Sequence, residues 1–463
     1  MKVELKDVSF KYPNTEKGAI KGINLSIKQG EFVLLAGASG CGKTTITRLI
    51  NGLIPGFYGG KQEGKAFINE KEIKDYKSFE LSSMVGCVFQ NPRTQFFNVD
   101  TDSELAFGLE NAGKDRETIN NVLDKVTDDL GIWNLRNRDI FKLSGGEKQK
   151  IAFASVYATD PDIYVLDEPS ANLDAKGVES IKHNLEKIKD KGKTVIVAEH
   201  RLYYLKDLVD RVIIMCDGHI DKDISGEVFR KMQPKELNQL GLRTNRAEKV
   251  ENRREKVDSK EESINLTLKN ICVELGGKTI LDDLNLNFPA GTITCITGHN
   301  GVGKSTLLRT LCGLIKAKRG EIIVKGKKCG AKKLKEKAFL VMQDVNYQLF
   351  ADSVYNECSL GLKEGKGEKT DRALESMGLC EYKDRHPNTL SGGEKQRLAI
   401  AVSLMMDKDI LLFDEPTSGL DYKNMILCAD IMKKMAAMGK TVIVVTHDEE
   451  FMKCCCERVI SFS

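Results

Sequence analysis

Gly37-Ala38-Ser39-Gly40-Cys41-Gly42-Lys43-Thr44 is the stretch on which fold and chemistry depend, and Thr45 follows it. It fits G-x-x-x-x-G-K-[ST], a loop whose glycines let backbone N–H groups converge on phosphate oxygens. An apolar, strand-like run, residues 32–36, precedes it, and a helix-like segment, residues 45–50, follows. The helix N-terminus adds partial positive charge, the lysine adds a full charge, and the threonine hydroxyl can bind Mg²⁺. The stretch therefore predicts a nucleotide-phosphate site.

A second copy of this loop reads Gly298-His299-Asn300-Gly301-Val302-Gly303-Lys304-Ser305, with Thr306 after it. It too lies between an apolar run, residues 293–297, and a helix-like segment, residues 306–311. Chance does not account for two matches in matching contexts. We therefore expect two phosphate-binding loops.

Other landmarks recur at a fixed distance. Ser144, Asp167 and His200 are followed 247 residues later by Ser391, Asp414 and His447. Such a repeat predicts two domains of one plan, residues 1–242 and 263–463. Residues 243–262 carry seven basic and six acidic residues and read as a charged linker, although a solvated helix face would join two domains equally well.

Continuous apolar runs of four or five residues, such as 163–166 and 194–198, are separated by helical patterns. Strands of this kind are buried on both faces, which is typical of a mostly parallel α/β sheet. With 41% apolar and 30% charged residues and a net charge of +4, the composition is that of an ordinary globular protein without a broad nucleic-acid footprint. No run approaches a membrane span and the N-terminus lacks a signal-peptide pattern, so we expect the chain in the cytoplasm.

The thirteen cysteines are odd in number and form no C-x-x-C pair. A disulfide framework or a structural zinc site is therefore not expected. Cys454-Cys455-Cys456 resembles a metal-binding run, but three adjacent thiols cannot all turn toward one ion without distorting the backbone. We expect buried, reduced cysteines.

Two strands end in the sequence Asp-Glu. Asp167 and Asp414 are placed to reach Mg²⁺, and the neighbouring Glu168 and Glu415 to polarise a water. An isolated Asp-Glu-Pro would read as a cap between strand and turn. Because each copy follows a phosphate loop, the catalytic interpretation is favoured.

The most specific signal is the pair Leu143-Ser144-Gly145-Gly146-Glu147 and Leu390-Ser391-Gly392-Gly393-Glu394. Ser-Gly-Gly at a helix start offers a hydroxyl and unobstructed N–H groups to an anion. The alternative is a simple N-cap, which would explain one copy more readily than two, each 23 residues before its Asp.

Each half resembles the nucleotide-binding domain of an ABC ATPase in the order of its motifs: phosphate loop, glutamine (Gln90 or Gln343), Leu-Ser-Gly-Gly, Asp-Glu and His. The resemblance implies two tandem P-loop NTPase domains of ABC type, each with a mostly parallel core sheet, a helical lobe and an antiparallel β region. It implies ATP and Mg²⁺ as cofactors. The two domains would pair head to tail within the chain around two ATP molecules.

The resemblance also assigns roles to single residues. Lys43, Glu168 and His200 would act opposite Ser391-Gly392-Gly393, and Lys304, Glu415 and His447 opposite Ser144-Gly145-Gly146. Mg²⁺ would be held by Thr44, Gln90 and Asp167 in one site and by Ser305, Gln343 and Asp414 in the other. Asp174 and Asp421 would lie in loops that link the sites, and Tyr12 would stack on adenine, where the second half has Leu275.

Gln90-Asn91-Pro92-Arg93-Thr94-Gln95-Phe96-Phe97 is similar to the energy-coupling-factor importers, as is Ala198-Glu199-His200-Arg201-Leu202. This resemblance implies vitamin or transition-metal uptake, with the chain on the cytoplasmic face of the cell membrane and no nucleic-acid partner. Its partners would be a transmembrane coupling subunit and a substrate-binding membrane subunit. Gln95, Phe96, Gln348 and Phe350 would line the groove that grips coupling helices, unless the phenylalanines are ordinary core.

Two alternatives stay open. One is the ATPase of a sugar or nucleoside ABC importer, although such chains often have one degenerate site and this chain retains both. The other is a tandem ABC protein that acts on ribosomes and transports nothing. Ribosome-associated members generally carry a longer linker.

Overall fold

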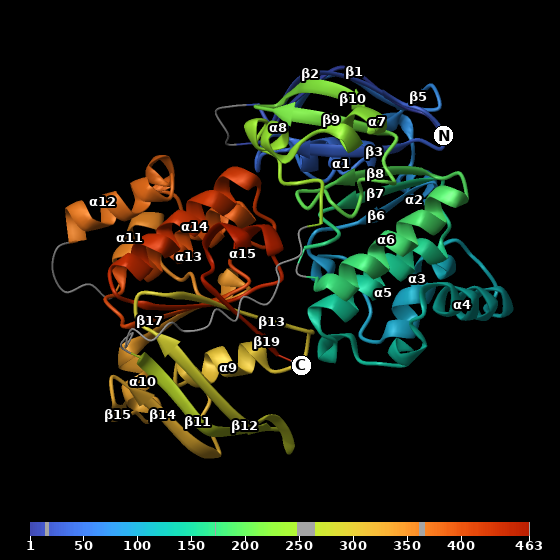
Figure 1. Ribbon diagram of the computed structural model, residues 1–463. Helices are drawn as coiled ribbons and strands as arrows, with labels where there is room; N and C mark the ends of the chain where they lie inside the picture. Colours follow the sequence, from blue (N-terminus) through green and yellow to red (C-terminus); the bar gives the residue numbers. More distant parts are fainter. Residues whose placement is uncertain (14–17, 172, 248–263, 361–365, 463) are drawn as a thin grey trace. The chain divides into compact units, whose positions relative to one another are not determined.

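The computed structural model describes residues 1–13, 18–171, 173–247, 264–360 and 366–462 (Figure 1). The chain divides into two compact units, Met1–Ala247 and Glu248–Ser463. Each contains one antiparallel and one mainly parallel sheet. The predicted fold class, two domains of the same α/β plan, is confirmed.

Unit one has an antiparallel sheet in the order β2-β1-β4-β5 and a six-stranded sheet in the order β10-β9-β3-β8-β7-β6. The first is built from β1 (Val3–Lys11), β2 (Ile20–Ile27), β4 (Lys61–Ile68) and β5 (Lys71–Glu72). The second is built from β3 (Phe32–Gly37), β6 (Val85–Val88), β7 (Ile163–Asp167), β8 (Thr194–Ala198), β9 (Arg211–Cys216) and β10 (His219–Ser225). The β9–β10 pair is an antiparallel hairpin, and the other pairs of this sheet are parallel.

The helices of unit one are α1 (Lys43–Ile50), α2 (Ser78–Met84), α3 (Thr101–Asn111), α4 (Arg116–Leu130), α5 (Gly145–Ala158), α6 (Ala175–Asp190), α7 (Gly226–Lys231) and α8 (Pro234–Gln239). They bury both faces of the central strands. In β3, Phe32 and Leu34 belong to one core cluster, whereas Val33 and Leu35 belong to another on the opposite face. This explains why the strand is apolar at every position.

Unit two repeats the plan with a β12-β11-β14-β15 sheet and a fully parallel β16-β17-β18-β13-β19 sheet. Its strands are β11 (Ile264–Leu275), β12 (Lys278–Pro289), β13 (Ile293–Gly298), β14 (Arg319–Val324), β15 (Lys327–Lys328), β16 (Ala338–Val341), β17 (Ile410–Asp414), β18 (Thr441–Val445) and β19 (Arg458–Phe462). Its helices are α9 (Lys304–Leu311), α10 (Ala331–Lys337), α11 (Val354–Ser359), α12 (Lys366–Ser376), α13 (Gly392–Met405), α14 (Tyr422–Ala437) and α15 (Glu449–Cys455). Within the residues described, no helix is long and apolar enough to cross a bilayer.

The structure differs from the sequence-based expectations in two places. The linker was expected to begin at residue 243, but Arg243, Thr244 and Asn245 are buried in unit one, and the Asn245 amide donates to the Phe229 carbonyl at 2.6 Å. A charged, polar run predicts a linker, but its first residues are packed inside unit one. The remainder of the expected linker, 248–262, lies outside the described residues.

The second correction concerns the cysteines. A disulfide joins Cys295 in β13 to Cys456 at the end of α15, with Cα atoms 6.0 Å apart across 161 residues of sequence. Cys455 stays a buried thiol, and burial raises its pKa. Cysteine spacing along the chain could not show a pair that the fold brings together from distant elements.

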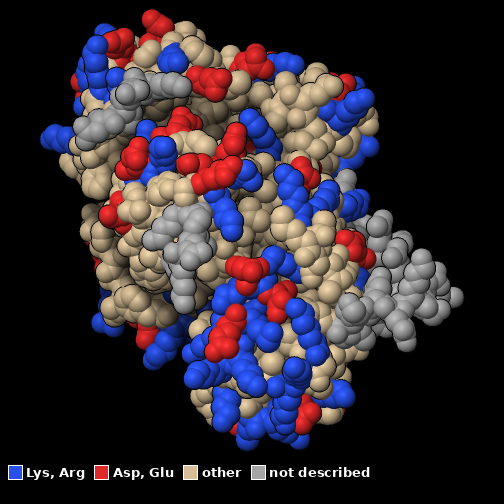
Figure 2. All heavy atoms as spheres, turned by 90° about the vertical axis from the view of Figure 1, so that its left-hand side faces the viewer, with Lys and Arg blue, Asp and Glu red and all other residues tan. Residues whose placement is uncertain are grey.

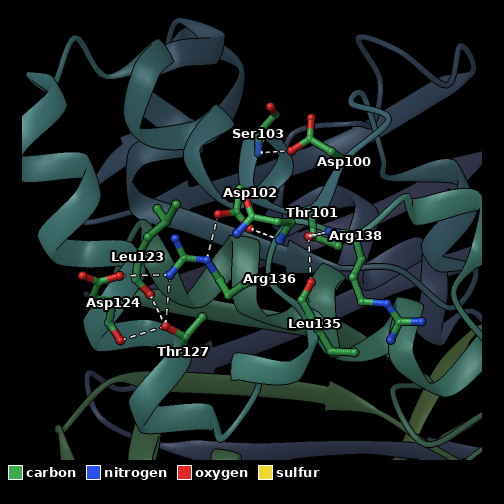
Figure 3. A network of polar contacts seen from close by, with 11 residues as sticks. Asp100, Thr101, Asp102, Ser103, Leu123, Asp124, Thr127, Leu135, Arg136 and Arg138 are labelled. Carbon is green, nitrogen blue, oxygen red and sulfur yellow. Dashed lines mark hydrogen bonds and ion pairs between the residues drawn. The ribbon is translucent and has the colours of Figure 1, made fainter.

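The helical lobe of unit one, formed by α3, α4 and α5, is held by a polar network around Arg136 (Figure 3). Arg136 donates from Nε to Asp102 Oδ2 at 2.8 Å and from Nη1 to Asp124 Oδ1 at 3.0 Å. Thr101 supports the same turn by donating to the Leu135 carbonyl at 2.7 Å. The network therefore fixes the segment after α4 against the start of α3.

We expect Arg136→Ala to destabilise this lobe by about 1.5–3 kcal/mol, because it leaves two carboxylates without their partly buried donor. The measurement is urea unfolding followed by fluorescence of Trp133, the sole tryptophan, whose ring lies 5.5 Å from the Arg136 guanidinium carbon. Arg116→Ala, at an exposed position on α4, is the matched control. Equal unfolding midpoints for the two variants would contradict the prediction.

Candidate active site

Two glycines of each phosphate loop occupy positions that no other residue fits. Gly37 has φ +148° and an added Cβ would lie 2.4 Å from the Met215 carbonyl oxygen. Gly298 has φ +142° and meets Phe462 at the same distance. The last glycines, Gly42 and Gly303, have φ +105° and +99° and cap α1 and α9. The loops thus bring the backbone to the helix N-terminus without side chains in the way.

The loop lysines are buried and point back into their own loops. Lys43 Nζ donates to the carbonyl oxygens of Gly37 and Ala38, both at 2.9 Å. Lys304 Nζ donates to those of Gly298 and, at 2.9 Å, His299. Both ammonium groups are therefore held inside the loop, where a phosphate would take their hydrogen bonds.

Two of the three expected magnesium ligands, the hydroxyl and the aspartate, meet in each unit. Thr44 Oγ1 donates to Asp167 Oδ1 at 3.1 Å, and the Ser305 hydroxyl bonds to Asp414. Burial raises the pKa of both aspartates, and these hydroxyl bonds oppose that rise. A hydroxyl beside a carboxylate is an all-oxygen donor set, which fits Mg²⁺.

Glu168 and Glu415 share an unusual backbone conformation. Their φ angles are +46° and +48°, in the left-handed region that glutamate rarely adopts. Each is held there by its N–H, which donates at 2.8 Å to the carbonyl of Ala198 or Val445 on the neighbouring strand. Strain of this kind is maintained where the side-chain direction matters, so it supports a functional role for both glutamates.

Side-chain contacts join Glu168 to two other expected residues. Gln90 Nε2 donates to Glu168 Oε2 at 2.7 Å, and His200 Nε2 lies 3.5 Å from Oε1. Burial raises the Glu168 pKa to about 8, with the charges of Asp167 and Glu199 adding to the effect. Burial also lowers the His200 pKa far below its usual value, so this histidine is neutral at pH 7. A carboxyl group with a pKa near the working pH is suited to taking a proton from water.

The second unit arranges the same pair differently. Glu415 Oε2 accepts from the Thr446 hydroxyl at 3.2 Å and the His447 N–H at 3.3 Å, while His447 Nε2 lies 3.7 Å from Oε1. In unit one, Glu199 stands where Thr446 stands in unit two. The glutamate–histidine pair is thus common to both units, but its surroundings are not.

Glu199 belongs to the cluster, although the sequence motifs do not predict a site role for it. It is buried and accepts from the Ser170 N–H at 3.2 Å, the Tyr204 hydroxyl at 2.9 Å and the His200 N–H at 2.8 Å. Its carboxylate therefore joins the loop after β7 to the loop after β8. The sequence signal was a charged residue directly after a buried strand.

Four other expected residues are the N-caps of helices. Ser144 and Ser391 each form a capping box at the start of α5 or α13, with the Glu three residues later. Asp174 and Asp421 are N-caps of α6 and α14. The cap interpretation is thus correct for the serines, and it leaves the glycine N–H groups at the helix N-terminus available to an anion.

The hydroxyl of Tyr12 lies 3.4 Å from Thr45 Oγ1 and accepts from Arg48 at 3.0 Å, while its ring packs edge-on against Phe10. Leu275 is 42% exposed.

We expect Tyr12→Ala to weaken ATP binding at the first loop about fivefold, the loss of one aromatic contact. Leu275→Ala is the matched control and should change ATP affinity at the second loop less than twofold. Equilibrium binding of a fluorescent ATP analogue measures both affinities, each in a variant that keeps only the lysine of the loop in question.

A groove of about 710 Å³ opens beside the Gln90 segment of unit one. Its lining includes Phe57, Leu81, Gln95, Phe97 and Phe107, and the rings of Phe97 and Phe107 stack with centroids 4.9 Å apart. Phe57 and Phe97 are 76% and 75% exposed. The groove is thus apolar and open to a partner.

Phe96 is expected in such a groove, but it does not line this one. Its ring packs against the core, and the exposed counterpart of Phe350 is Phe97, the next residue along. Gln95 lines the groove but also satisfies strand β6, accepting from the Phe89 N–H at 3.2 Å and donating to the Cys87 carbonyl at 3.1 Å. Gln348 makes the matching bonds to Met342 and Leu340.

Comparison with known proteins agrees with this geometry. Residues 20–171 and 281–418 match the family described as ABC transporter. A Treponema denticola protein whose name describes an ABC transporter ATP-binding protein is 49% identical over 466 residues, covering 100% of this chain and 95% of its own. YkoD of Bacillus subtilis, named for HMP/thiamine import, is 32% identical over 98% of this chain and 89% of its own.

Among solved structures, a model of ribosome-bound archaeal Pelota and ABCE1 matches 98% of this chain and 76% of that one, with a TM-score of 0.71 and 20% identity. That likeness concerns the fold alone. The duplicated phosphate loops, the paired glutamates and histidines and the two family matches lead to one assignment: the chain belongs to the ABC transporter family, as an ATP-binding, ATP-hydrolysing subunit with two nucleotide-binding domains.

Proposed function

We propose that this ATPase energises a membrane importer of the energy-coupling-factor type that takes up a vitamin or a transition-metal ion. The Gln90–Phe97 segment supports this class. The name of YkoD, which specifies HMP/thiamine import, supports the vitamin branch. The chain would lie on the cytoplasmic face of the cell membrane, beneath a transmembrane coupling subunit and a substrate-binding membrane subunit.

The apolar groove of unit one carries the proposal. Exposed Phe57 and Phe97 flank a cavity of about 710 Å³, which suits the apolar face of a short amphipathic helix. The same segment contains Gln90, whose amide bonds to Glu168. A helix seated in the groove would therefore contact the segment that positions the catalytic glutamate.

ATP and Mg²⁺ are the cofactors of this proposal. Thr44, Gln90 and Asp167 would hold the ion in one site, and Ser305, Gln343 and Asp414 in the other, while Lys43 and Lys304 bind the phosphates. Bound Mg²⁺ would neutralise charge on the phosphate oxygens. Glu168 and Glu415 would orient the attacking water and take its proton, each held in place by its own histidine.

The two units would pair head to tail. Ser391-Gly392-Gly393 would then complete the site of Lys43, and Ser144-Gly145-Gly146 that of Lys304. The glycine N–H groups at the starts of α5 and α13 support this, because each helix directs them toward an anion. ATP binding would bring the units together, and hydrolysis would release them.

Purification of the tagged chain from its native membranes tests the proposal. Two small polytopic proteins should accompany it, and Phe97→Ser should lose them. Val228→Ser, which removes an exposed apolar side chain on α7, should retain them. Recovery of ribosomal proteins, or of the same membrane partners with both variants, would overturn the proposal. If the membrane partners are found, comparing the uptake of labelled thiamine precursors with that of cobalt or nickel ions would identify the cargo.

A further inference from the structure

One segment of the antiparallel lobe, from its third strand to the following helix, differs sharply in charge between the two units. From β14 to the end of α10, residues 319–337 contain eight Lys or Arg and two Glu. The corresponding elements of unit one, β4 to α2, span residues 61–84 and contain five Lys and five Asp or Glu. The same stretch of the fold thus carries a net +6 in unit two and no net charge in unit one.

Half of these eight basic residues have an acidic partner, and the other four, with the neighbouring Lys316, have none among the described residues. Arg319 pairs with Asp282, Lys325 and Lys337 with Asp409, and Lys328 with Glu321. Five lysines make no ion pair with any part of the chain that the structure describes and are exposed: Lys316, Lys327, Lys332, Lys333 and Lys335, here termed the basic face. Figure 2 shows Lys and Arg gathered over this lobe with few acidic residues among them.

Helix α10 holds three of these lysines on a fixed support. Leu334 is 2% exposed and anchors the helix to the lobe, so Lys332, Lys333 and Lys335 extend into solvent around it. Lys408 donates to the Glu336 carbonyl at 2.8 Å and closes the end of the helix. The charges are therefore clustered by the fold, not spread along a flexible segment.

The position of α10 indicates the side of unit two on which these lysines lie. Its counterpart α2 lines the groove of unit one through Ser78, Leu81 and Ser82, and the third of these corresponds to Lys335 of α10. If the groove receives a membrane subunit, as the proposed function states, α10 lies on the corresponding, membrane-directed side of unit two. This step rests on the proposed function.

We propose that the basic face binds anionic phospholipid headgroups. Clusters of four to eight lysines or arginines beside a membrane attract such lipids. A nucleic acid is less well matched, because residues 316–337 contain no aromatic side chain on which a base could stack. Their single arginine, which could form bidentate phosphate contacts, is paired with Asp282.

Co-sedimentation of the purified full-length chain with vesicles tests this inference. Phosphatidylcholine vesicles that contain phosphatidylglycerol should bind the chain about tenfold more tightly than phosphatidylcholine alone, and binding should weaken with added salt. The triple variant Lys332→Ala, Lys333→Ala, Lys335→Ala should lose this preference. Its basal ATP turnover should be unchanged.

The matched control removes the same charge from the equivalent lobe of unit one: Lys65→Ala, Lys74→Ala, Lys77→Ala. It should bind vesicles like the parent chain. Equal vesicle binding by both triple variants, or no preference of the parent chain for phosphatidylglycerol, would overturn the inference. It would also be overturned if the Lys332, Lys333 and Lys335 variant kept its vesicle binding but lost binding to duplex RNA. Because no membrane subunit is present, this result is independent of the Phe97→Ser test, which decides the proposed function.

Discussion

Replacing Glu168 and Glu415 together by glutamine is expected to lower ATP turnover at least about 100-fold while ATP binding persists. A positioned base contributes roughly 10²–10⁴-fold, and glutamine cannot accept the proton of the attacking water. The substitution preserves size, and the amide can still bond to Gln90 or Thr446. Phosphate release under saturating ATP measures turnover, and equilibrium binding of a labelled nucleotide measures retention.

The structure explains why the effect should be catalytic. Glu168 and Glu415 are both directed by a left-handed backbone that a strand-to-strand hydrogen bond maintains. Glu110→Gln and Glu375→Gln remove equal charge at exposed helix positions and serve as controls. If the double variant keeps turnover within threefold of the controls, the two glutamates are not the bases.

Much of this site could be predicted from the sequence, because its parts are local. A phosphate loop needs its glycines, its lysine and the following hydroxyl at fixed spacing, and the flanking apolar runs show that a strand and a helix enclose it. The aspartates and glutamates at strand ends follow the same logic. Parallel strands bring their carboxyl ends to one edge, so Thr44 and Asp167 meet across 123 residues of sequence.

The features that sequence reasoning missed depend on distant pairing or on side-chain direction. Cys295 and Cys456 meet only because β13 lies beside β19. Phe96 and Phe97 are chemically identical neighbours, and only the turn after β6 decides which is packed and which is exposed. In both cases, neither residue type nor spacing along the chain shows the pairing or the side-chain direction that the fold produces.

Glu199 shows a subtler difference between the halves. In unit two the loops after β17 and β18 are joined by Thr417, which donates to Asp448 at 2.7 Å. In unit one Glu199 replaces this link by accepting from the Ser170 N–H and the Tyr204 hydroxyl. The Glu199 carboxylate thus joins the two loops in unit one, as the Thr417–Asp448 pair does in unit two. Matching the histidines of the two halves does not reveal this difference.

The head-to-tail arrangement can be tested through Gly145 and Gly392. A Cβ added at either position meets no heavy atom within 4 Å, and an acidic residue at the first turn of a helix is favourable. Aspartate should therefore be tolerated in α5 and α13. Its carboxylate would oppose the γ-phosphate of whichever ATP faces that helix, so each substitution should disable one site without unfolding its unit.

Combining these aspartates with Glu168→Gln should give opposite results. If Gly392 completes the site of Glu168, the pair Glu168→Gln/Gly392→Asp damages one site twice and should retain, within about twofold, the turnover of Glu168→Gln alone. Glu168→Gln/Gly145→Asp damages both sites and should fall about 100-fold below the parent chain, to the level of the double glutamine variant. Both variants carry two substitutions of the same kinds, so general destabilisation affects them alike. Equal loss in the two, or the reverse order, would contradict head-to-tail pairing, because only a site shared between units makes the combination with Gly145→Asp the more damaging of the two.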